Sequence, residues 1–399
     1  MGLAAARHAA LASVSRSVGE LSQLSPDRKR AQLSSQVGRV AFAVPGDLAT
    51  PTGGYHYDRR IIQELRRLGW QVDVLNLGHG FPFPSVAERA IALAMLSAVP
   101  DGTPIVLDGL AFGALPEAGA LRSRTPLIAL VHQPLALDSG LDPAQAERFL
   151  ASERIALAAA ARVVVTSEST GRIVTADYGV QAWRVSVVRP GSDRAPLAHG
   201  STDSIVRLLS VGSIVPVKGY DVLIEALATV ADLPWRLTIA GDRTRNPAAA
   251  AKLDTDISDH GLGDRVFVLG ALSPERIGVL YLASDVFVLA SRFEGYGMAL
   301  AEAVAHGLPV VSTKAGAIPD TIPAGTGLLV PPNDVPSLAQ ALRHLISCRV
   351  ERRRLAANAR GAAAQLPTWQ ESAGLFAGAI EAAGKPRACR NLSSIPILF

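Results

Sequence analysis

The chain has 399 residues, 49% hydrophobic and 19% charged, which fits two globular domains and excludes a disordered or fibrous protein. Its net charge of +4 resides in residues 1–39, which hold six basic and two acidic side chains, so the neutral remainder gives little reason to expect nucleic-acid binding. Two distant cysteines exclude a disulfide framework, and no apolar run reaches the roughly 20 residues that span a bilayer.

The first segment, residues 1–38, is rich in Ala, Ser and Arg. It lacks the continuous apolar core of a secretory signal, so we interpret it as a flexible N-terminal extension or the product of a misassigned start codon, with a transit-like segment as the third alternative. The low cysteine content is typical of a reducing compartment, which predicts a cytoplasmic protein.

From residue 39, short apolar runs alternate with helical stretches. RVAFAVP (39–45) predicts a strand, and a Gly/Pro turn and an amphipathic helix follow it. The further runs of this half are QVDVLNLG, PIVLDG, PLIALVHQ, RVVVTS and RVSVVRPG. Continuous Val/Ile/Leu runs indicate strands covered on both faces, hence a parallel sheet. Residues 39–190 are therefore predicted to form a doubly wound, Rossmann-like α/β domain.

A linker and a second domain follow. Residues 191–204 are rich in Pro, Gly, Ser and Asp without periodicity, as linkers are. The strand pattern then restarts with IVRLLSVG, WRLTIAG, RVFVLG, DVFVLAS, PVVST and GLLVPP. Residues 205–366 therefore predict a second Rossmann-like domain. A helix at 367–384 could run back across the domain junction, and residues 385–399 are predicted to be a loose tail.

The carboxyl ends of the two predicted sheets face one another across a cleft, and ligands of open α/β sheets bind outside such ends. The polar and glycine residues expected there are Gly53, Gly54, Asp108, His132, Ser167, Thr170, Ser213, Lys218, Asp242, Gly270 and Glu294. Taken singly they have ordinary explanations. Asp108, Ser167 and Asp242 occupy positions typical of helix caps, and a histidine that ends an apolar strand is often structural.

The segment SRFEGYGMALAEAVAHGLPVVST (291–313) is the most informative stretch. Glu294 and Glu302 lie eight residues apart, on either side of a glycine turn that becomes a helix N-terminus. Such a turn brings backbone N–H groups close to an anion, and the helix dipole attracts it. The alternative is a βαβ unit with a capping and a surface glutamate. Lys218 directly precedes Gly219 and a helix, which suits a diphosphate.

In combination, SVGSIVPVKGYDVLIEAL (210–227) and residues 291–313 resemble the nucleotide-binding half of retaining glycosyltransferase family 4, the group 1 enzymes of GT-B fold. PTGGYHYDRRIIQEL (51–65) resembles the glycine loop and first helix of that family, and VTSEST and VVRPGSD resemble the end of its first domain. The resemblance extends over residues 40–384, and its most specific part is the pair of glutamates around EGYG.

The resemblance implies roles for individual residues. Glu302 would accept hydrogen bonds from the ribose hydroxyls of a nucleotide, and Glu294 would contact the transferred sugar. Lys218 would neutralise the diphosphate, and Gly54 would approach it from the first domain. His132 matches the active-site histidine near that sugar. The backbone groups implied to hold phosphate, sugar or base are those of Gly295, Tyr296, Gly297, Met298 and Gly270.

The resemblance thus implies a metal-independent, retaining hexosyltransferase that uses a UDP-, GDP- or ADP-sugar and no cofactor. Its acceptor, a lipid, a glycan or a small molecule, is not readable from these residues. An epimerase or hydrolase of sugar nucleotides has the same architecture and stays open as an alternative. So does a degenerate relative that binds nucleotide sugar without activity.

One departure from the family pattern supports that last alternative. Family members usually carry an arginine where this chain has Ser213, so half of a cationic clamp on the diphosphate is missing. A lost charge-assisted contact of this kind weakens stabilisation by about 1.5–3 kcal/mol. Arg243, Arg245 and Arg292 are the candidates to replace it. Asp320 keeps the charge of a glutamate found in many relatives.

Two further patterns have competing interpretations. Asp254 and Asp256 form a D-x-D sequence like the metal motif of another glycosyltransferase fold, but they lie in a predicted surface helix, so we expect no metal there. The first helix carries arginines on shared faces, which could contact an anionic membrane at its inner surface or simply be solvated. These arginines are Arg59, Arg60, Arg66 and Arg67.

Overall fold

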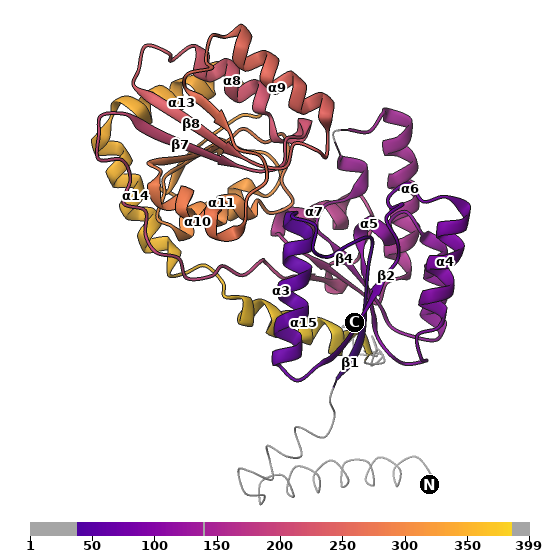
Figure 1. The fold of residues 1–399 in the computed structure, drawn as a ribbon. Helices are drawn as coiled ribbons and strands as arrows, with labels where there is room; N and C mark the ends of the chain where they lie inside the picture. The colour runs from indigo at the N-terminus through magenta and orange to yellow at the C-terminus, as the bar shows by residue number, and fades with distance from the viewer. Residues whose placement is uncertain (1–37, 139, 385–399) are drawn as a thin grey trace, which may run out of the picture.

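The computed structural model describes residues 38–138 and 140–384, which form two α/β domains (Figure 1). Each domain contains a six-stranded sheet in which every strand pair is parallel. The strand orders are β2-β1-β3-β4-β5-β6 and β12-β11-β10-β7-β8-β9. The prediction of two doubly wound parallel sheets is therefore confirmed.

The first domain contains β1 to β6 and the helices between them. Its strands are β1 (Arg39–Val44), β2 (Gln71–Asn76), β3 (Ile105–Asp108), β4 (Leu127–Val131), β5 (Arg162–Val165) and β6 (Val185–Val187). Its α-helices are α3 (Gly53–Arg67), α4 (Val86–Ser97), α5 (Gly109–Phe112), α6 (Pro143–Ala159) and α7 (Glu168–Ala176). Short 3₁₀ helices occupy Pro116–Ser123, Leu135–Leu137 and Ala182–Arg184.

The second domain contains β7 to β12. Its strands are β7 (Val206–Val211), β8 (Trp235–Ala240), β9 (Val266–Val268), β10 (Val286–Leu289), β11 (Val310–Thr313) and β12 (Gly327–Val330). Its helices are α8 (Tyr220–Ala228), α9 (Pro247–Asp259), α10 (Pro274–Ala283), α11 (Met298–Ala305), α12 (Ile318–Thr321), α13 (Val335–Ser347) and α14 (Arg349–Ala363), with a 3₁₀ turn at Pro216–Lys218. Among the helices of the described ranges, none has the length and apolar character needed to cross a bilayer.

The strands are buried on both faces, as their continuous apolar runs predict. In β1, Val40, Phe42 and Val44 point into one core cluster, whereas Ala41 and Ala43 point into another on the opposite face. Each face of the sheet is covered by helices, so the alternation of side chains along the strand supplies two separate cores.

The final helix, α15 (Trp369–Gly384), leaves the second domain and packs beside α3 of the first (Figure 1). The Phe376 ring stacks against Phe42 with centroids 6.0 Å apart. Ser372 donates a hydrogen bond to the Arg189 carbonyl at 2.7 Å. Two chain segments therefore connect the domains, the linker after β6 and the segment that leads into α15. The predicted extension and tail lie outside the described residues, apart from residue 38.

Candidate active site

The glycine turn after β10 lies directly against the end of β4 in the other domain. A side-chain carbon at Gly295 would overlap the carbonyl oxygen of His132, so only glycine permits this approach. The Thr166 and Thr170 hydroxyls also donate to the Gly295 carbonyl at 3.4 Å. The sequence predicted Gly295 as an anion-binding position; the structure in addition makes it a point of contact between the domains.

Glu294 and Lys218 form an ion pair at the carboxyl ends of neighbouring strands of the second sheet. The Lys218 Nζ lies 2.6 Å from Glu294 Oε1, which also accepts a hydrogen bond from the Ser291 hydroxyl at 2.6 Å. Lys218 is 21% exposed and Glu294 10%. Lys218 and Glu294, which the sequence places in separate loops, are thus in direct contact. This contact brings the lysine ammonium group next to the glycine turn.

Glu302 occupies the second turn of α11, and its environment disfavours charge. Burial raises the pKa of its carboxyl to about 7, although the hydrogen bond from Tyr281 opposes this shift and nearby Asp193 adds to it. The Tyr281 hydroxyl lies 3.1 Å from Glu302 Oε2. Because Asp193 belongs to the interdomain linker, its effect on this pKa places Glu302 in the neighbourhood of the linker. This carboxyl can change its charge near neutral pH.

The imidazole of His132 lies next to two buried carboxylates of the first domain. Its Nε2 is 3.0 Å from Asp58 Oδ1 and 3.6 Å from Asp108 Oδ2. Burial and the charge of Asp58 raise the pKa of Asp108 to about 7. Burial opposes a charged His132, but the charge and hydrogen bond of Asp58 outweigh it and raise the pKa of the imidazole. Asp108 is also the N-cap of α5, as its position predicts.

Asp58 was missed by reasoning from the sequence. It is fully buried on α3 beside Tyr57 and near Ile61, within the apolar face of an amphipathic helix. A carboxylate inside such a face is costly unless it is paired, and that is the signal that could have identified it.

Asp58, Asp108 and His132 are the one group of three side chains in the described ranges whose ligand atoms lie close enough together to hold a metal ion. The donor set has suitable chemistry, because carboxylate oxygens and imidazole nitrogen are common ligands. The distances of 3.0 and 3.6 Å separate one ligand atom from another, and ligand atoms that surround one ion at about 2.0–2.2 Å lie at similar separations from each other.

Gly54 and Met298 also lie where the domains approach each other. A Cβ atom at Gly54 would lie 3.4 Å from Cδ2 of His132, so the glycine loop borders the imidazole. Met298, the first residue of α11, packs against the core cluster of the first domain that includes Tyr57. Tyr296 is buried in the second domain, and Gly297 has the left-handed φ of 90° that lets the turn enter α11.

The loops after β7 and β8 lie in contact around Ser213. A Cβ at Gly241 would overlap the Gly212 carbonyl and lie 3.1 Å from the Ser213 nitrogen. Gly241 in turn donates a hydrogen bond to the carbonyl of Gly270 at 2.8 Å, so the position expected to border a base adjoins the same loops. Glycine is required at Gly241 because the two loops touch through their backbones.

The three arginines proposed to replace the missing clamp residue differ in their surroundings. Arg292 is bound to Asp221 at 2.8 Å, and Arg243 forms an ion pair with Asp254. Arg245 forms no ion pair with any residue in the described ranges, and its charge lowers the pKa of Tyr55 on the opposite domain against the raising effect of burial. Arg245 is therefore the candidate of the three that is not already neutralised.

Asp254 and Asp256 lie on the exposed helix α9, as predicted. Besides the pair of Asp254 with Arg243, Asp256 binds Lys252 at 2.8 Å. Each carboxylate thus has a basic partner, and the two do not converge on a common point as a metal-binding pair would.

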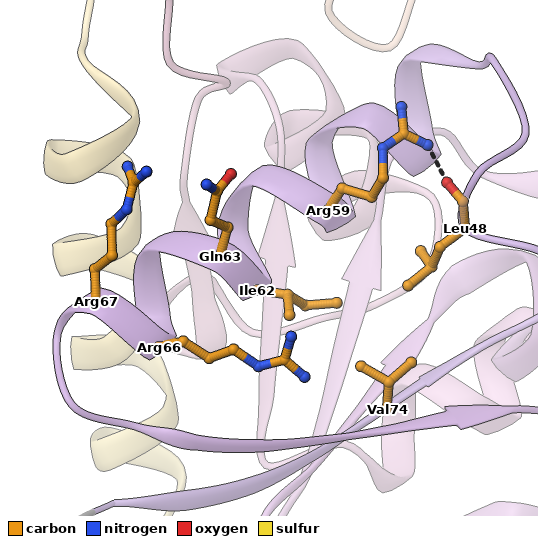
Figure 2. A pocket seen from close by; sticks show the side chains of 7 residues that line it. All are labelled: Leu48, Arg59, Ile62, Gln63, Arg66, Arg67 and Val74. Carbon is orange, nitrogen blue, oxygen red and sulfur yellow. Dashed lines mark hydrogen bonds between the residues drawn. The ribbon is translucent and has the colours of Figure 1, made fainter.

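A cavity of about 690 Å³ lies between α3 and β2, at the edge of the first sheet (Figure 2). Its floor is apolar and its rim is basic. Its lining residues are Leu48, Arg59, Ile62, Gln63, Arg66, Arg67 and Val74.

Arg60 does not line this cavity, although the sequence grouped it with Arg67. It forms an ion pair with Asp193 of the linker and lies 4.8 Å above the ring of Trp369. Arg59 donates to the Leu48 carbonyl and Arg66 to the Val72 carbonyl at 2.9 Å.

Two family models match most of the two domains. The model of glycosyl transferases group 1 matches residues 194–362, and that of a glycosyl transferase 4-like domain matches residues 105–191.

Curated relatives cover a similar extent. The chain is 30% identical over 360 residues to a D-inositol 3-phosphate glycosyltransferase of Catenulispora acidiphila, a match of 75% of this chain and 84% of the relative. It is 29% identical over 269 residues to the MMP alpha-(1->4)-mannosyltransferase of Mycolicibacterium hassiacum. That match covers 62% of this chain and 63% of the relative, slightly less than two thirds of its length.

Solved structures show the same architecture. Sucrose-phosphate synthase from Thermosynechococcus elongatus superposes with a TM-score of 0.72 at 22% identity, over 86% of this chain and 98% of that one. Anabaena HepE in complex with UDP-glucose gives 0.70 at 20% identity, over 86% and 99%. These likenesses concern the fold, and they agree with the two facing parallel-sheet domains of the GT-B architecture.

Proposed function

Because the chain belongs to the glycosyl transferases group 1 family, we propose that it transfers a sugar from a nucleotide-diphosphate donor to an acceptor hydroxyl, with retention of configuration and without a metal ion. The observation that carries the proposal is the meeting of Lys218, Glu294 and the Gly295 turn with His132 of the other domain. Cationic and N–H groups placed there stabilise the charge that develops on the leaving diphosphate.

The donor would lie along the second domain. In this proposal Glu302 binds the ribose, Glu294 exchanges its bond with Lys218 for one to the sugar, and the freed Lys218 binds the diphosphate. A UDP-sugar is the first donor to test, since the similar HepE structure contains UDP-glucose. A short-lived oxocarbenium-like ion pair would let the acceptor attack from the face that the diphosphate leaves. An inverted product would contradict this mechanism.

The acceptor would enter beside the first domain. The name of the D-inositol 3-phosphate glycosyltransferase points to a polyol hydroxyl, so inositol 3-phosphate is the first acceptor to test. The name of the mannosyltransferase adds a mannosyl donor to the panel.

Donor binding tests the site directly. UDP-, GDP- and ADP-sugars are compared by thermal shift, where a ligand at 100 times its Kd stabilises by about 2.7 kcal/mol. Lys218→Ala and Glu302→Ala are each expected to abolish the shift given by the true donor. Full retention of the shift by both variants would show that the site is misplaced.

Incubation of the donor without acceptor separates the alternatives. Release of free sugar or formation of an epimer would favour a hydrolase or an epimerase. Tight binding of donor with no product in any acceptor panel would favour a degenerate binding protein, as the serine at position 213 allows.

The basic cavity supports a proposed contact with anionic lipid through Arg59, Arg66 and Arg67, because its apolar floor can receive acyl carbons beneath a phosphate-binding rim (Figure 2). We expect Arg66→Gln/Arg67→Gln to reduce co-sedimentation with phosphatidylglycerol vesicles at least fivefold. Arg60→Gln is the matched control, since Arg60 is bound to the linker, and it should sediment like the wild type. Equal sedimentation of all three proteins would contradict the contact.

A further inference from the structure

The ring of Tyr281, on α10, is packed against two other rings of the second domain. Its centroid lies 5.8 Å from that of Phe287 on β10 and 4.8 Å from that of His306, directly after α11. Both pairs are close to parallel, and Tyr281 is only 1% exposed. A ring enclosed in this way has little room to tilt, so its hydroxyl group is held in one place.

One of these rings, that of His306, is attached to the interdomain linker. Its Nδ1 lies 2.8 Å from the Pro196 carbonyl, and a carbonyl oxygen only accepts, so Nδ1 carries the proton and donates it. The Ala198 N–H in turn donates to the His306 carbonyl at 2.8 Å. The linker therefore fixes the imidazole against which Tyr281 is packed.

The Tyr281 hydroxyl has one proton and two acceptors within reach, the Ala299 carbonyl at 3.0 Å and Glu302 Oε2 at 3.1 Å. The Ala299 carbonyl lies inside α11, where the N–H group four residues later is its ordinary partner. Glu302 Oε2 accepts from no other group in the described ranges. A carboxylate is also the stronger acceptor, so the proton of Tyr281 is directed to Glu302.

The other carboxylate oxygen of Glu302 is available to a ligand. Oε1 accepts no hydrogen bond from residues 38–138 or 140–384, and it is not one of their fully buried oxygens that lack a partner. It is therefore reached by solvent. Glu302 also lies on the helix that begins at the glycine turn, next to the ion pair of Lys218 with Glu294.

We propose that Tyr281 is a positioning residue, which holds Oε2 of Glu302 so that Oε1 is presented to the ribose hydroxyls of the nucleotide donor. The inference rests on the proposed function for the place of the ribose. Tyr281 acts only through Glu302 and does not contact the ligand. Without its hydroxyl, the glutamate would sample several rotamers, and ordering it on binding would cost affinity for nucleotides that carry ribose hydroxyls.

Tyr281→Phe keeps the packed ring and removes only the hydroxyl. UDP, GDP and ADP are compared with their 2′,3′-dideoxy counterparts by calorimetry at pH 8, where Glu302, with a pKa of about 7, is mainly ionised. For the nucleotide that binds the wild type most tightly, we expect Tyr281→Phe to raise the Kd at least fivefold. The Kd of its dideoxy counterpart should stay within twofold, because that compound offers Glu302 no ribose hydroxyl.

The dideoxy compound separates positioning from general support of the fold. A structural defect in Tyr281→Phe would weaken the binding of both compounds equally, and this result would overturn the proposal. So would an unchanged Kd for both compounds, or a wild-type protein that binds the two equally well.

Ser284→Ala is the matched control. Ser284 directly follows α10, is 6% exposed, and donates its hydroxyl to the Leu280 carbonyl at 2.6 Å without contacting Glu302. This variant also loses a buried hydroxyl, and we expect both Kd values to match those of the wild type. A selective loss of affinity for the ribonucleotide in Ser284→Ala as well would contradict a specific role of Tyr281.

Activity assays keep this inference distinct from the proposed function. If Tyr281→Phe loses the preference for the ribonucleotide but the wild type transfers no sugar, the transferase is rejected and the inference is supported. If the wild type is an active transferase whose preference for the ribonucleotide is unchanged by Tyr281→Phe, the inference is rejected and the proposed function is supported.

Discussion

At the scale of single residues, Glu302 combines two opposing demands. Its carboxyl is held in a partly buried position by Tyr281, where burial favours the neutral acid, yet the proposed contact with ribose hydroxyls is strongest for a carboxylate. Because the pKa of the Glu302 carboxyl is about 7, the effect of its charge on donor binding can be measured near neutral pH.

We expect donor affinity to depend on pH through Glu302. Because its pKa in the free protein is about 7, lowering the pH from about 8 to 6 should raise the donor Kd, approaching tenfold per pH unit below the pKa. Calorimetric titrations at several pH values measure this directly. Glu302→Gln should bind weakly with a flat dependence; the same pH dependence in this variant would assign the titration to another group.

At the scale of elements, the glycine turn after β10 is a place where the backbones of the two domains are in direct contact. Gly295→Ala places a carbon against the His132 carbonyl, and both partners are backbone, so the domains must separate to accommodate it. We expect at least a hundredfold loss in kcat/KM with the unfolding midpoint little changed, since the overlap lies between domains and outside the two cores. Kinetics and thermal unfolding together measure this.

Gly278→Ala is the matched control for that prediction. Gly278 lies inside helix α10, and a Cβ there meets no atom within 4 Å. Replacement of a helix glycine by alanine should stabilise the protein by about 0.5–1 kcal/mol and leave activity unchanged. A comparable loss of activity in both variants would argue against a specific contact at Gly295.

These elements also show what could be predicted from the sequence. The runs around β4 and β10 gave the correct strands because parallel strands are apolar throughout, and the glycine turn was placed correctly at the end of one of them. The pairing of Lys218 with Glu294, the burial of Asp58 beneath His132 and the contact of Gly295 with the other domain were not predictable. Each depends on the relative placement in space of segments that are more than 70 residues apart in the sequence. Local sequence patterns carry no information about that placement.

At the scale of the molecule, the two domains are joined by polar contacts as well as by α15. Asp320 of the second domain accepts a hydrogen bond from the Ser169 backbone of the first at 2.8 Å, and Arg60 binds the linker at Asp193. Among residues 38–138 and 140–384, charged contacts of this kind between the domains are few, which suits domains that open and close around a substrate.

The apolar attachment of α15 should be much stronger. Phe376 is fully buried against Phe42, so Phe376→Ala is expected to destabilise the first domain by about 3–5 kcal/mol. Chemical denaturation followed by separate probes in each domain measures it. Leu375→Ala is the control, because Leu375 on the same helix is 61% exposed and should change stability by less than about 0.5 kcal/mol. Equal effects of both would mean that α15 is not docked as described.

The return of α15 to the first domain has a consequence for biosynthesis. The ribosome delivers β1 to β6 long before it delivers Trp369, Phe376 and Ile380, which complete the core cluster beneath β1. The part of this sheet face that α3 does not cover therefore stays exposed while the whole second domain is translated, and the domain made first is the last to be finished. A chain truncated before α15 should for that reason leave an exposed apolar face on its N-terminal half and aggregate, even though every residue of the proposed donor site is present.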